Sequence, residues 1–195
     1  AQIRLMEKLQ NHKGQDSVRV FRPADCYEAK VCWQMAMENT DTPTALIFSR
    51  QAVKCLPEGN DYEQARKGAY IVKGSDDNPD VILVASGSEV ATLEAGAELL
   101  RKDGIRVRIV SAPSEGLFRR QPVGYQDNVL PCNVKKFGLT AGLPCTLEGL
   151  VGIGPNSRIF GLRSFGFSAP YKVLDEKLGF TGDNVYKQVK SFLSE

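Results

Sequence analysis

Apolar and polar residues follow two patterns along the chain, one typical of buried strands and one typical of helices. The clearest strand is the continuous apolar run Val81–Ala85, as expected for a parallel strand buried on both faces. Gly87 predicts a tight turn, and Ser88 predicts the N-cap of a helix. Apolar residues then recur at helical spacing, at Val90, Leu93, Ala97 and Leu100. Gly104 ends this helix and residues 105–110 resume as a strand, which predicts a β-α-β unit with parallel strands.

Weaker patterns predict further elements in this half of the chain. Residues 68–73 predict a strand at the edge of the sheet, and residues 133–139 and 157–162 predict two more, the first of them weak. Ser168-Ala169-Pro170 predicts a helix start with Ser168 as the N-cap, and Gly179 predicts its end. Thr181 predicts the N-cap of the last helix.

The N-terminal quarter has its own β-α-β pattern. Residues 1–13 predict a helix, residues 17–21 a strand, and residues 44–48 a second strand. Between the strands, Asp25 caps a helix that runs to about residue 38, with Glu28 in the position of a capping box. Two strands and one helix cannot cover both faces of a sheet, so we expect a truncated α/β domain whose apolar surface meets a partner or the next domain.

The abrupt N-terminus adds the expectation that this sequence begins inside a larger protein. Residues 52–66 have the composition of a linker.

Composition excludes several classes of function. The 195 residues carry a formal net charge of only +2, which argues against a nucleic-acid-binding face. No apolar run is long enough to cross a bilayer. Five scattered cysteines without a C-x-x-C pair, and a single histidine at His12, make a zinc site improbable and fit free thiols in a reducing cytoplasm. We interpret His12 as a solvated residue rather than a catalytic base.

Two places are candidates for binding a phosphate. Ser86–Glu89 lies between a strand and a helix N-terminus, where phosphates often bind. However, the glycine patterns of dinucleotide and nucleotide loops are missing, and a turn with one glycine and one cap explains the same residues. Arg50 follows a buried strand, and its planar guanidinium suits a phosphate or carboxylate. A surface ion pair is the alternative interpretation of Arg50.

Five motifs occur together and in order. They are Arg22-Pro23-Ala24-Asp25 with Glu28, residues 43–51 ending in Ser49-Arg50-Gln51, residues 80–90, residues 108–114, and Phe165-Gly166-Phe167-Ser168-Ala169-Pro170. Each motif is modest alone, but in this order they closely resemble the C-terminal third of the transketolase family over nearly the whole chain.

This resemblance implies a domain organisation and a fold. Residues 1–51 would be the end of the domain that holds the thiamine pyrimidine ring, residues 52–66 a linker, and residues 67–195 the C-terminal domain. The latter would be α/β, with a mixed, mostly parallel sheet and helices on both faces.

The resemblance also implies a function. Transketolases transfer a two-carbon ketol unit from a ketose phosphate to an aldose phosphate, with thiamine diphosphate and Mg²⁺ (or Ca²⁺), usually as homodimers. Arg50 matches the arginine that binds the sugar phosphate. The family's motif for the diphosphate and metal, its catalytic histidines and its activating glutamate are absent, so the chain alone is expected to bind no cofactor and to be inactive.

Two alternatives remain at this point. One is a stand-alone module that binds a phosphate or nucleotide at Ser86–Glu89, and the other is the equivalent domain of another thiamine-dependent enzyme, such as a ketoacid dehydrogenase component. The sequence also departs from the transketolase pattern at Thr140, where an acidic residue is common, and at Leu143-Pro144.

Overall fold

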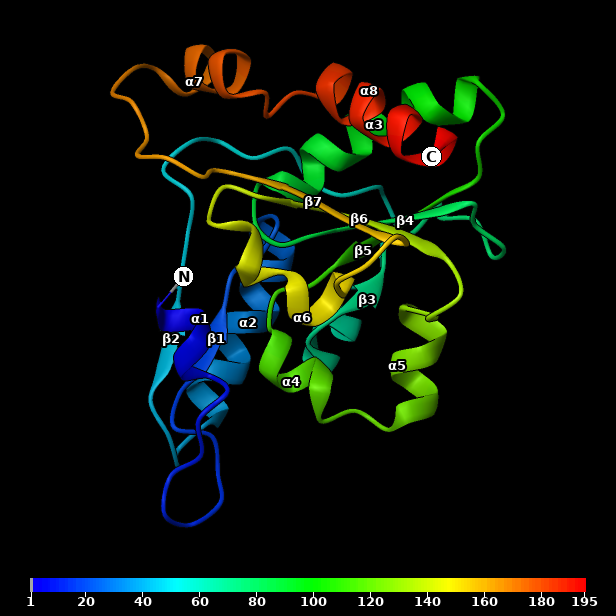
Figure 1. Cartoon of the computed structure of the whole chain (residues 1–195). Helices are drawn as coiled ribbons and strands as arrows, with labels where there is room; N and C mark the ends of the chain where they lie inside the picture. Colours follow the sequence, from blue (N-terminus) through cyan, green and yellow to red (C-terminus); the bar gives the residue numbers. More distant parts are fainter. Residues whose placement is uncertain (1) are drawn as a thin grey trace.

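Two sheets of unequal size organise the chain in the computed structural model, which describes residues 2–195 (Figure 1). The larger sheet has five strands in the order β3-β5-β4-β6-β7. Their bounds are β3 Tyr70–Ile71, β4 Val81–Ala85, β5 Val107–Ser111, β6 Lys135–Thr140 and β7 Ser157–Gly161. All neighbouring pairs are parallel except β3 with β5. The predicted mixed, mostly parallel sheet with an edge strand near residue 70 is therefore confirmed.

Helices cover both faces of the large sheet, as predicted (Figure 1). On one face lie α3 Glu89–Lys102 and α8 Gly182–Ser194, with α7 Tyr171–Leu178 beside them. On the other lie α4 Glu115–Arg119, α5 Val123–Val129, the short 3-10 helix η2 Pro144–Thr146, and α6 Glu148–Val151.

The alternation of side chains along β4 explains why its sequence is continuously apolar. Val81, Leu83 and Ala85 belong to the core beneath α3 and α8. Ile82 and Val84 belong to the core on the opposite face. Every residue of β4 is buried because successive side chains point to opposite faces and both faces are covered.

The smaller sheet belongs to the N-terminal part of the chain. It pairs β1 Arg19–Phe21 in parallel with β2 Thr44–Leu46, and α2 Cys26–Glu38 connects the two strands. The predicted strand 44–48 is therefore shorter as a regular strand, although the Ile47 amide still donates to the Phe21 carbonyl at 2.8 Å.

The N-terminal unit shares a small core with the segment that follows it. The 3-10 helix η1 Tyr62–Lys67 packs against α2. Ala65 of η1 and Tyr70 of β3 are buried with Phe21 and Val31. The division of the chain at residues 51 and 67 remains a prediction.

An apolar surface of the N-terminal unit stays open, as expected for a two-stranded sheet with one helix. Trp33, Met37 and Phe48 are all exposed and line one groove, and Met37 is 71% exposed.

The predicted helix over residues 1–13 is wrong in its extent. Among the described residues the helix α1 covers only Gln2–Met6, and Ala1 lies outside them. The chain then turns, and Gln10 forms an isolated bridge with Asp16. The apolar side chains Ile3, Met6 and Leu9 remain exposed. Without packing on that face, a short helix is not stable enough to extend.

The strand that a weak pattern predicted over residues 133–139 is present as β6 and is central in the sheet. The weakly patterned β6 lies between β4 and β7 and is almost wholly buried. Its two lysines at positions 135 and 136 and Gly138 obscure the apolar pattern. Lys135 is the first residue of β6 and donates to the Phe192 carbonyl at 2.8 Å, so its charge stays near the surface.

Two predicted N-caps differ from the structure. Ser88 precedes α3, but its side chain forms no capping hydrogen bond. Ser168 does not cap α7, because Pro170 still has extended backbone and the helix begins at Tyr171. The helix ends where predicted, at Gly179 with left-handed backbone.

Thr181 does cap α8, and we expect Thr181→Ala to lower the free energy of unfolding by about 1 kcal/mol. The hydroxyl accepts a hydrogen bond from the Asn184 amide, and alanine leaves that amide without its partner. Ser88→Ala is the matched control and should change stability by less than about 0.5 kcal/mol. Urea unfolding followed by circular dichroism measures both. Equal losses would show that the hydrogen bond of Thr181 is not what stabilises the helix start.

Candidate functional site

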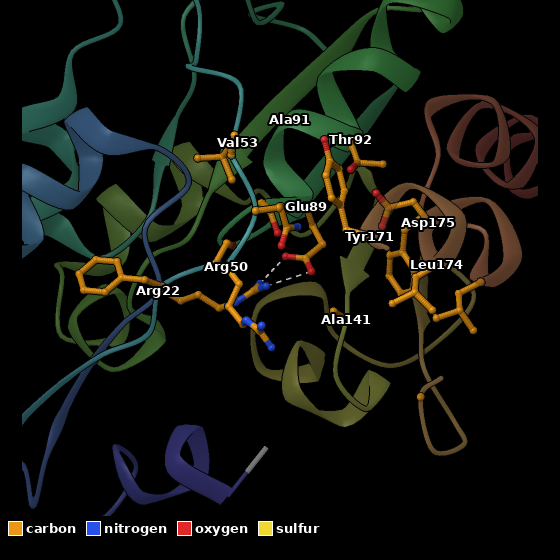
Figure 2. Close-up of a pocket in the computed structure, with 18 of the residues that line it drawn as sticks. Arg22, Arg50, Val53, Glu89, Ala91, Thr92, Ala141, Tyr171, Leu174 and Asp175 are labelled. Carbon is orange, nitrogen blue, oxygen red and sulfur yellow. Dashed lines mark hydrogen bonds and ion pairs between the residues drawn. The ribbon is translucent and has the colours of Figure 1, made fainter. Parts of the chain in front are cut away.

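A cleft of about 570 Å³ lies where the N-terminal unit meets the large sheet (Figure 2). Residues 47–54 form one wall, and the start of α3 with α7 forms the other. Ala141 and Leu162, which follow β6 and β7, also line it. The cleft therefore opens beyond the carboxyl ends of the parallel strands, where α/β proteins bind their ligands.

Arg50 lies on the wall formed by residues 47–54. Its side chain is exposed, and among residues 2–195 it has no carboxylate within ion-pair distance. The planar donors of its guanidinium are therefore available to an anion that enters the cleft.

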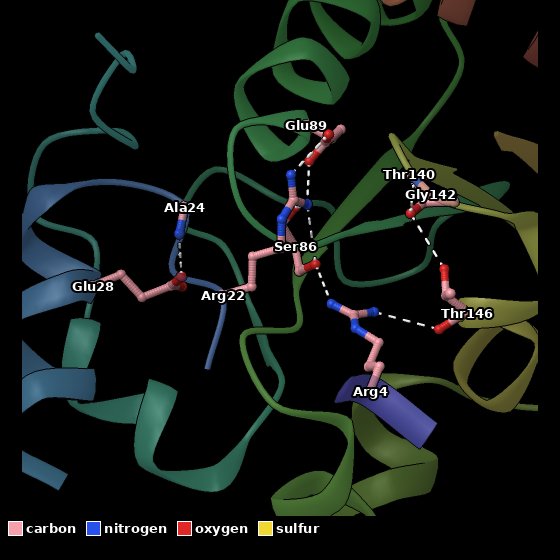
Figure 3. A network of polar contacts seen from close by, with 9 residues as sticks. All are labelled: Arg4, Arg22, Ala24, Glu28, Ser86, Glu89, Thr140, Gly142 and Thr146. Carbon is pink, nitrogen blue, oxygen red and sulfur yellow. Dashed lines mark hydrogen bonds and ion pairs between the residues drawn. The ribbon is translucent and has the colours of Figure 1, made fainter. Parts of the chain in front are cut away.

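Arg22 also lines the cleft, but its guanidinium already forms an ion pair with a carboxylate. Its Nη2 donates to Glu89 Oε1 at 2.9 Å, and its Nη1 contacts Glu89 Oε2 and the Ser86 carbonyl (Figure 3). Glu89 is buried at the first position of α3. The pair neutralises the base of the cleft and ties the residue after β1 to the start of α3. No local pattern in the sequence predicts this contact.

Gly87 explains why the loop Ser86–Glu89 resembles a phosphate-binding loop. Its φ is +67°, which favours glycine, and a Cβ there would lie 2.6 Å from the guanidinium carbon of Arg22. The lack of a side chain at Gly87 thus leaves room for the guanidinium of Arg22. This geometry supports the interpretation of Ser86–Glu89 as a turn, although Ser88 and Glu89 line the same cleft as Arg50.

A second carboxylate faces the cleft from α7. Burial raises the pKa of Asp175, and the negative charge of Glu89 raises it further. Arg22 already pairs with Glu89. The positive groups of the cleft wall without an ion pair among residues 2–195 are therefore Arg50 and Lys54, which both lie on the segment 47–54.

A second set of polar contacts lies beside the cleft (Figure 3). Arg4 donates to the Ser86 hydroxyl and, at 3.4 Å, to the Thr146 carbonyl. Thr140 accepts from the Gly142 amide at 3.1 Å and contacts the Thr146 hydroxyl at 3.3 Å. Thr140, the last residue of β6, is thus hydrogen-bonded to the segment that follows the strand, at the position where the resemblance would place an acidic residue.

Asp25 and Glu28 serve the start of α2, as predicted. Asp25 Oδ1 accepts from the Glu28 amide at 2.8 Å. Glu28 Oε2 accepts from the Ala24 amide at 2.5 Å, one residue before the expected capping-box partner. Glu28 is fully buried, and its Oε1 accepts from the hydroxyls of Tyr70 and Ser111. Burial raises its pKa to about 7 against the effect of these hydrogen bonds.

The remaining candidates are not gathered into a site. His12 lies in an exposed turn. The five cysteines are free, and only Cys32 is buried. Within the described residues, no group of three or more His, Cys, Asp or Glu side chains has the arrangement of a metal site. No helix in residues 2–195 has the length and apolar character needed to span a membrane.

The fold and the cleft together define a class of protein, the α/β domains that place a ligand site beyond the carboxyl ends of a mostly parallel sheet. Comparison with known proteins identifies the family. Residues 68–181 match the family described as the transketolase-like C-terminal domain. The chain belongs to the transketolase family.

Individual relatives agree with this assignment. A transketolase of Staphylococcus aureus is 38% identical over 95% of this chain. The structure of a transketolase from Leishmania mexicana is similar over 92% of this chain, with a TM-score of 0.82 and 33% identity. The Pichia stipitis transketolase in complex with sedoheptulose-7-phosphate has the same TM-score at 30% identity over 93% of this chain.

The chain spans only part of these relatives. It covers 28% of the Staphylococcus aureus protein and 26% of each of the two structures. The match decides against the alternative of a ketoacid dehydrogenase component.

Proposed function

We propose that this chain is the C-terminal part of a transketolase that transfers a two-carbon ketol unit between sugar phosphates of the pentose phosphate pathway. In this proposal Arg50 binds the phosphate of the sugar. The observation that carries the assignment to Arg50 is its position in the cleft, exposed and without a carboxylate partner among the described residues, while the neighbouring Arg22 is paired with Glu89. The sedoheptulose-7-phosphate bound to the Pichia stipitis relative supports a sugar phosphate as ligand.

Thiamine diphosphate and Mg²⁺ or Ca²⁺ belong to this proposal as cofactors of the whole enzyme. The described residues include no group of three or more Asp, Glu, Cys or His side chains that could hold the metal. The cofactor would therefore be held by other parts of the enzyme, and residues 2–195 supply the anion-binding wall formed by segment 47–54.

We further propose that the enzyme acts in the cytoplasm as a homodimer. Free thiols fit a reducing compartment. The exposed apolar groove lined by Trp33, Met37 and Phe48 fits coverage by the rest of the enzyme or by a second subunit.

In the intact enzyme, Arg50→Ala is expected to raise KM for phosphorylated donor and acceptor sugars at least about tenfold, with a smaller change in kcat. A charge-assisted bidentate hydrogen bond is worth roughly 1.5–3 kcal/mol, and a phosphate remote from the reacting carbon is bound alike in the ground and transition states. Steady-state kinetics with varied donor and varied acceptor measure the effect.

Two further variants sharpen this test. Arg50→Lys keeps the charge but loses the planar fork, so its KM should lie between those of wild type and Arg50→Ala. Arg66→Ala is the matched control, because Arg66 is half-buried on η1, pairs with Glu38 and lies outside the cleft. A KM for both sugars that stays unchanged in Arg50→Ala would remove Arg50 from the site.

A further inference from the structure

Two cysteines that are far apart in the sequence lie side by side on the surface. The sulfur atoms of Cys26 and Cys55 are 4.0 Å apart, and both side chains are exposed. Cys26 is the first residue of α2, and Cys55 follows the segment that lines the cleft. The contact between the two thiols raises the pKa of Cys55.

The proximity of these thiols is built into the backbone. Asp25, which precedes Cys26, accepts a hydrogen bond at Oδ2 from the amide of Leu56, which follows Cys55, at 2.8 Å. The same oxygen accepts from the Tyr62 hydroxyl at 2.7 Å. Leu56 is buried in the core of the large sheet. One carboxylate thus holds the neighbours of both cysteines together, so the thiols face each other in the folded chain.

We propose that Cys26 and Cys55 form a reversible disulfide by exchange with a low-molecular-weight disulfide such as oxidised glutathione. One of the two cysteines, as its thiolate, attacks the small disulfide, forms a mixed disulfide and expels one small thiolate. The other cysteine gives up its proton, attacks the protein sulfur of the mixed disulfide and expels the second thiolate. The protein loses two electrons and two protons, and the small disulfide gains them as two thiols.

The geometry favours this pair over the other cysteines. The sulfur atoms are 4.0 Å apart and must approach to about 2.05 Å for the bond to form. Both cysteines are exposed. Cys32 is buried, and burial raises its pKa strongly, so it is a poor nucleophile. Cys132 and Cys145 are exposed but have no contact with another cysteine sulfur among residues 2–195.

The bond would act on the cleft. It closes a loop over residues 26–55, which contains Arg50, and attaches the end of the cleft-lining segment 47–54 to α2. Oxidation is therefore expected to restrict that segment, and reduction to release it. Disulfides of this kind in a reducing compartment are typically transient and redox-sensing.

Oxidation of the full chain with excess oxidised glutathione, followed by trypsin digestion without reductant and mass spectrometry, tests the proposal. The expected product is a disulfide-linked pair of peptides covering residues 20–30 and 55–66, which dithiothreitol separates. Cys26→Ser and Cys55→Ser should each abolish the linked pair and leave a glutathione adduct on the remaining cysteine. Cys132→Ser and Cys145→Ser are the matched controls and should leave the linked pair unchanged.

Hydrogen exchange then tests the effect on the cleft. Exchange of the backbone amides of residues 49–55 should slow on oxidation of the wild type but not of Cys26→Ser. Glutathione adducts on both Cys26 and Cys55 without a linked pair would overturn the proposal, as would linkage through Cys132 or Cys145. Unchanged exchange in the oxidised wild type would overturn the proposed restriction of the cleft-lining segment.

Discussion

Replacing Glu28 with alanine is expected to lower the free energy of unfolding by about 4 kcal/mol. The side chain is fully buried and accepts hydrogen bonds from the Ala24 amide and from the hydroxyls of Tyr70 and Ser111. Each buried donor left without an acceptor costs roughly 1–3 kcal/mol, and the lost volume adds a cavity. Urea unfolding at pH 6, followed by circular dichroism, measures the change.

Two variants distinguish this network from a general effect of removing a glutamate. Glu28→Gln keeps the volume and most of the hydrogen bonds, so it should lose no more than about 1.5 kcal/mol. Glu98→Ala removes an exposed carboxylate from α3 and should stay within about 0.5 kcal/mol of wild type. A loss in Glu28→Ala as small as that in Glu98→Ala would contradict the role assigned to the network.

Glu28 also makes the free energy of unfolding depend on pH, and its contribution decreases as pH rises. Burial raises its pKa from 4.5 to about 7 in the folded chain. Below pH 4.5 both the folded and the unfolded chain carry the proton, and the contribution of Glu28 is fully present. Between pH 4.5 and 7 only the folded chain keeps it, so the free energy of unfolding falls by up to about 3 kcal/mol as pH rises. The difference between wild type and Glu28→Gln across this range isolates the contribution.

Arg22→Ala is expected to lower the free energy of unfolding by about 3 kcal/mol. The substitution leaves the buried carboxylate of Glu89 and the carbonyl of Ser86 without their donor. Removing one partner of a buried ion pair costs roughly 3–5 kcal/mol, and we take the lower end because the Arg22 side chain is 22% exposed. Urea unfolding of Arg22→Ala, of Glu89→Gln and of the double variant Arg22→Ala/Glu89→Gln measures the coupling between the two residues.

Arg106→Ala provides the matched control for Arg22→Ala. Arg106 pairs with Asp80 at 2.6 Å, but both side chains are largely exposed, so the loss should be under about 1 kcal/mol. The double variant Arg22→Ala/Glu89→Gln should be more stable than the sum of the single losses predicts, because it no longer buries an unpaired charge. Equal losses in Arg22→Ala and Arg106→Ala would show that burial does not set the strength of the pair.

Local sequence patterns predicted most of the secondary structure. Val81–Ala85 is a strand and α3 follows it, because an apolar run, a glycine turn and a helical stripe are encoded within a few neighbouring residues. The cap of α2 at Asp25 was predictable for the same reason. The helix over residues 1–13 was not, since its length depends on packing that the sequence does not reveal.

The candidate site was only partly predictable. Arg50 stood out because a guanidinium follows a predicted strand, and the structure places it in the cleft. Arg22 gave no comparable signal, because its partner Glu89 comes 67 positions later. A separation of 29 positions likewise concealed the contact of Cys26 with Cys55, since the sequence shows only scattered cysteines.

The sequence by itself determined the α/β class, the parallel β-α-β unit around Val81–Ala85, and the family, since periodicity, caps and motifs are properties of short stretches. Only the tertiary structure decided that Arg50 and the Ser88–Glu89 turn share one cleft, and that Arg22 neutralises Glu89 within it. The physical reason is that these contacts arise when the N-terminal unit docks on the large sheet, and no local pattern specifies which distant side chains then meet.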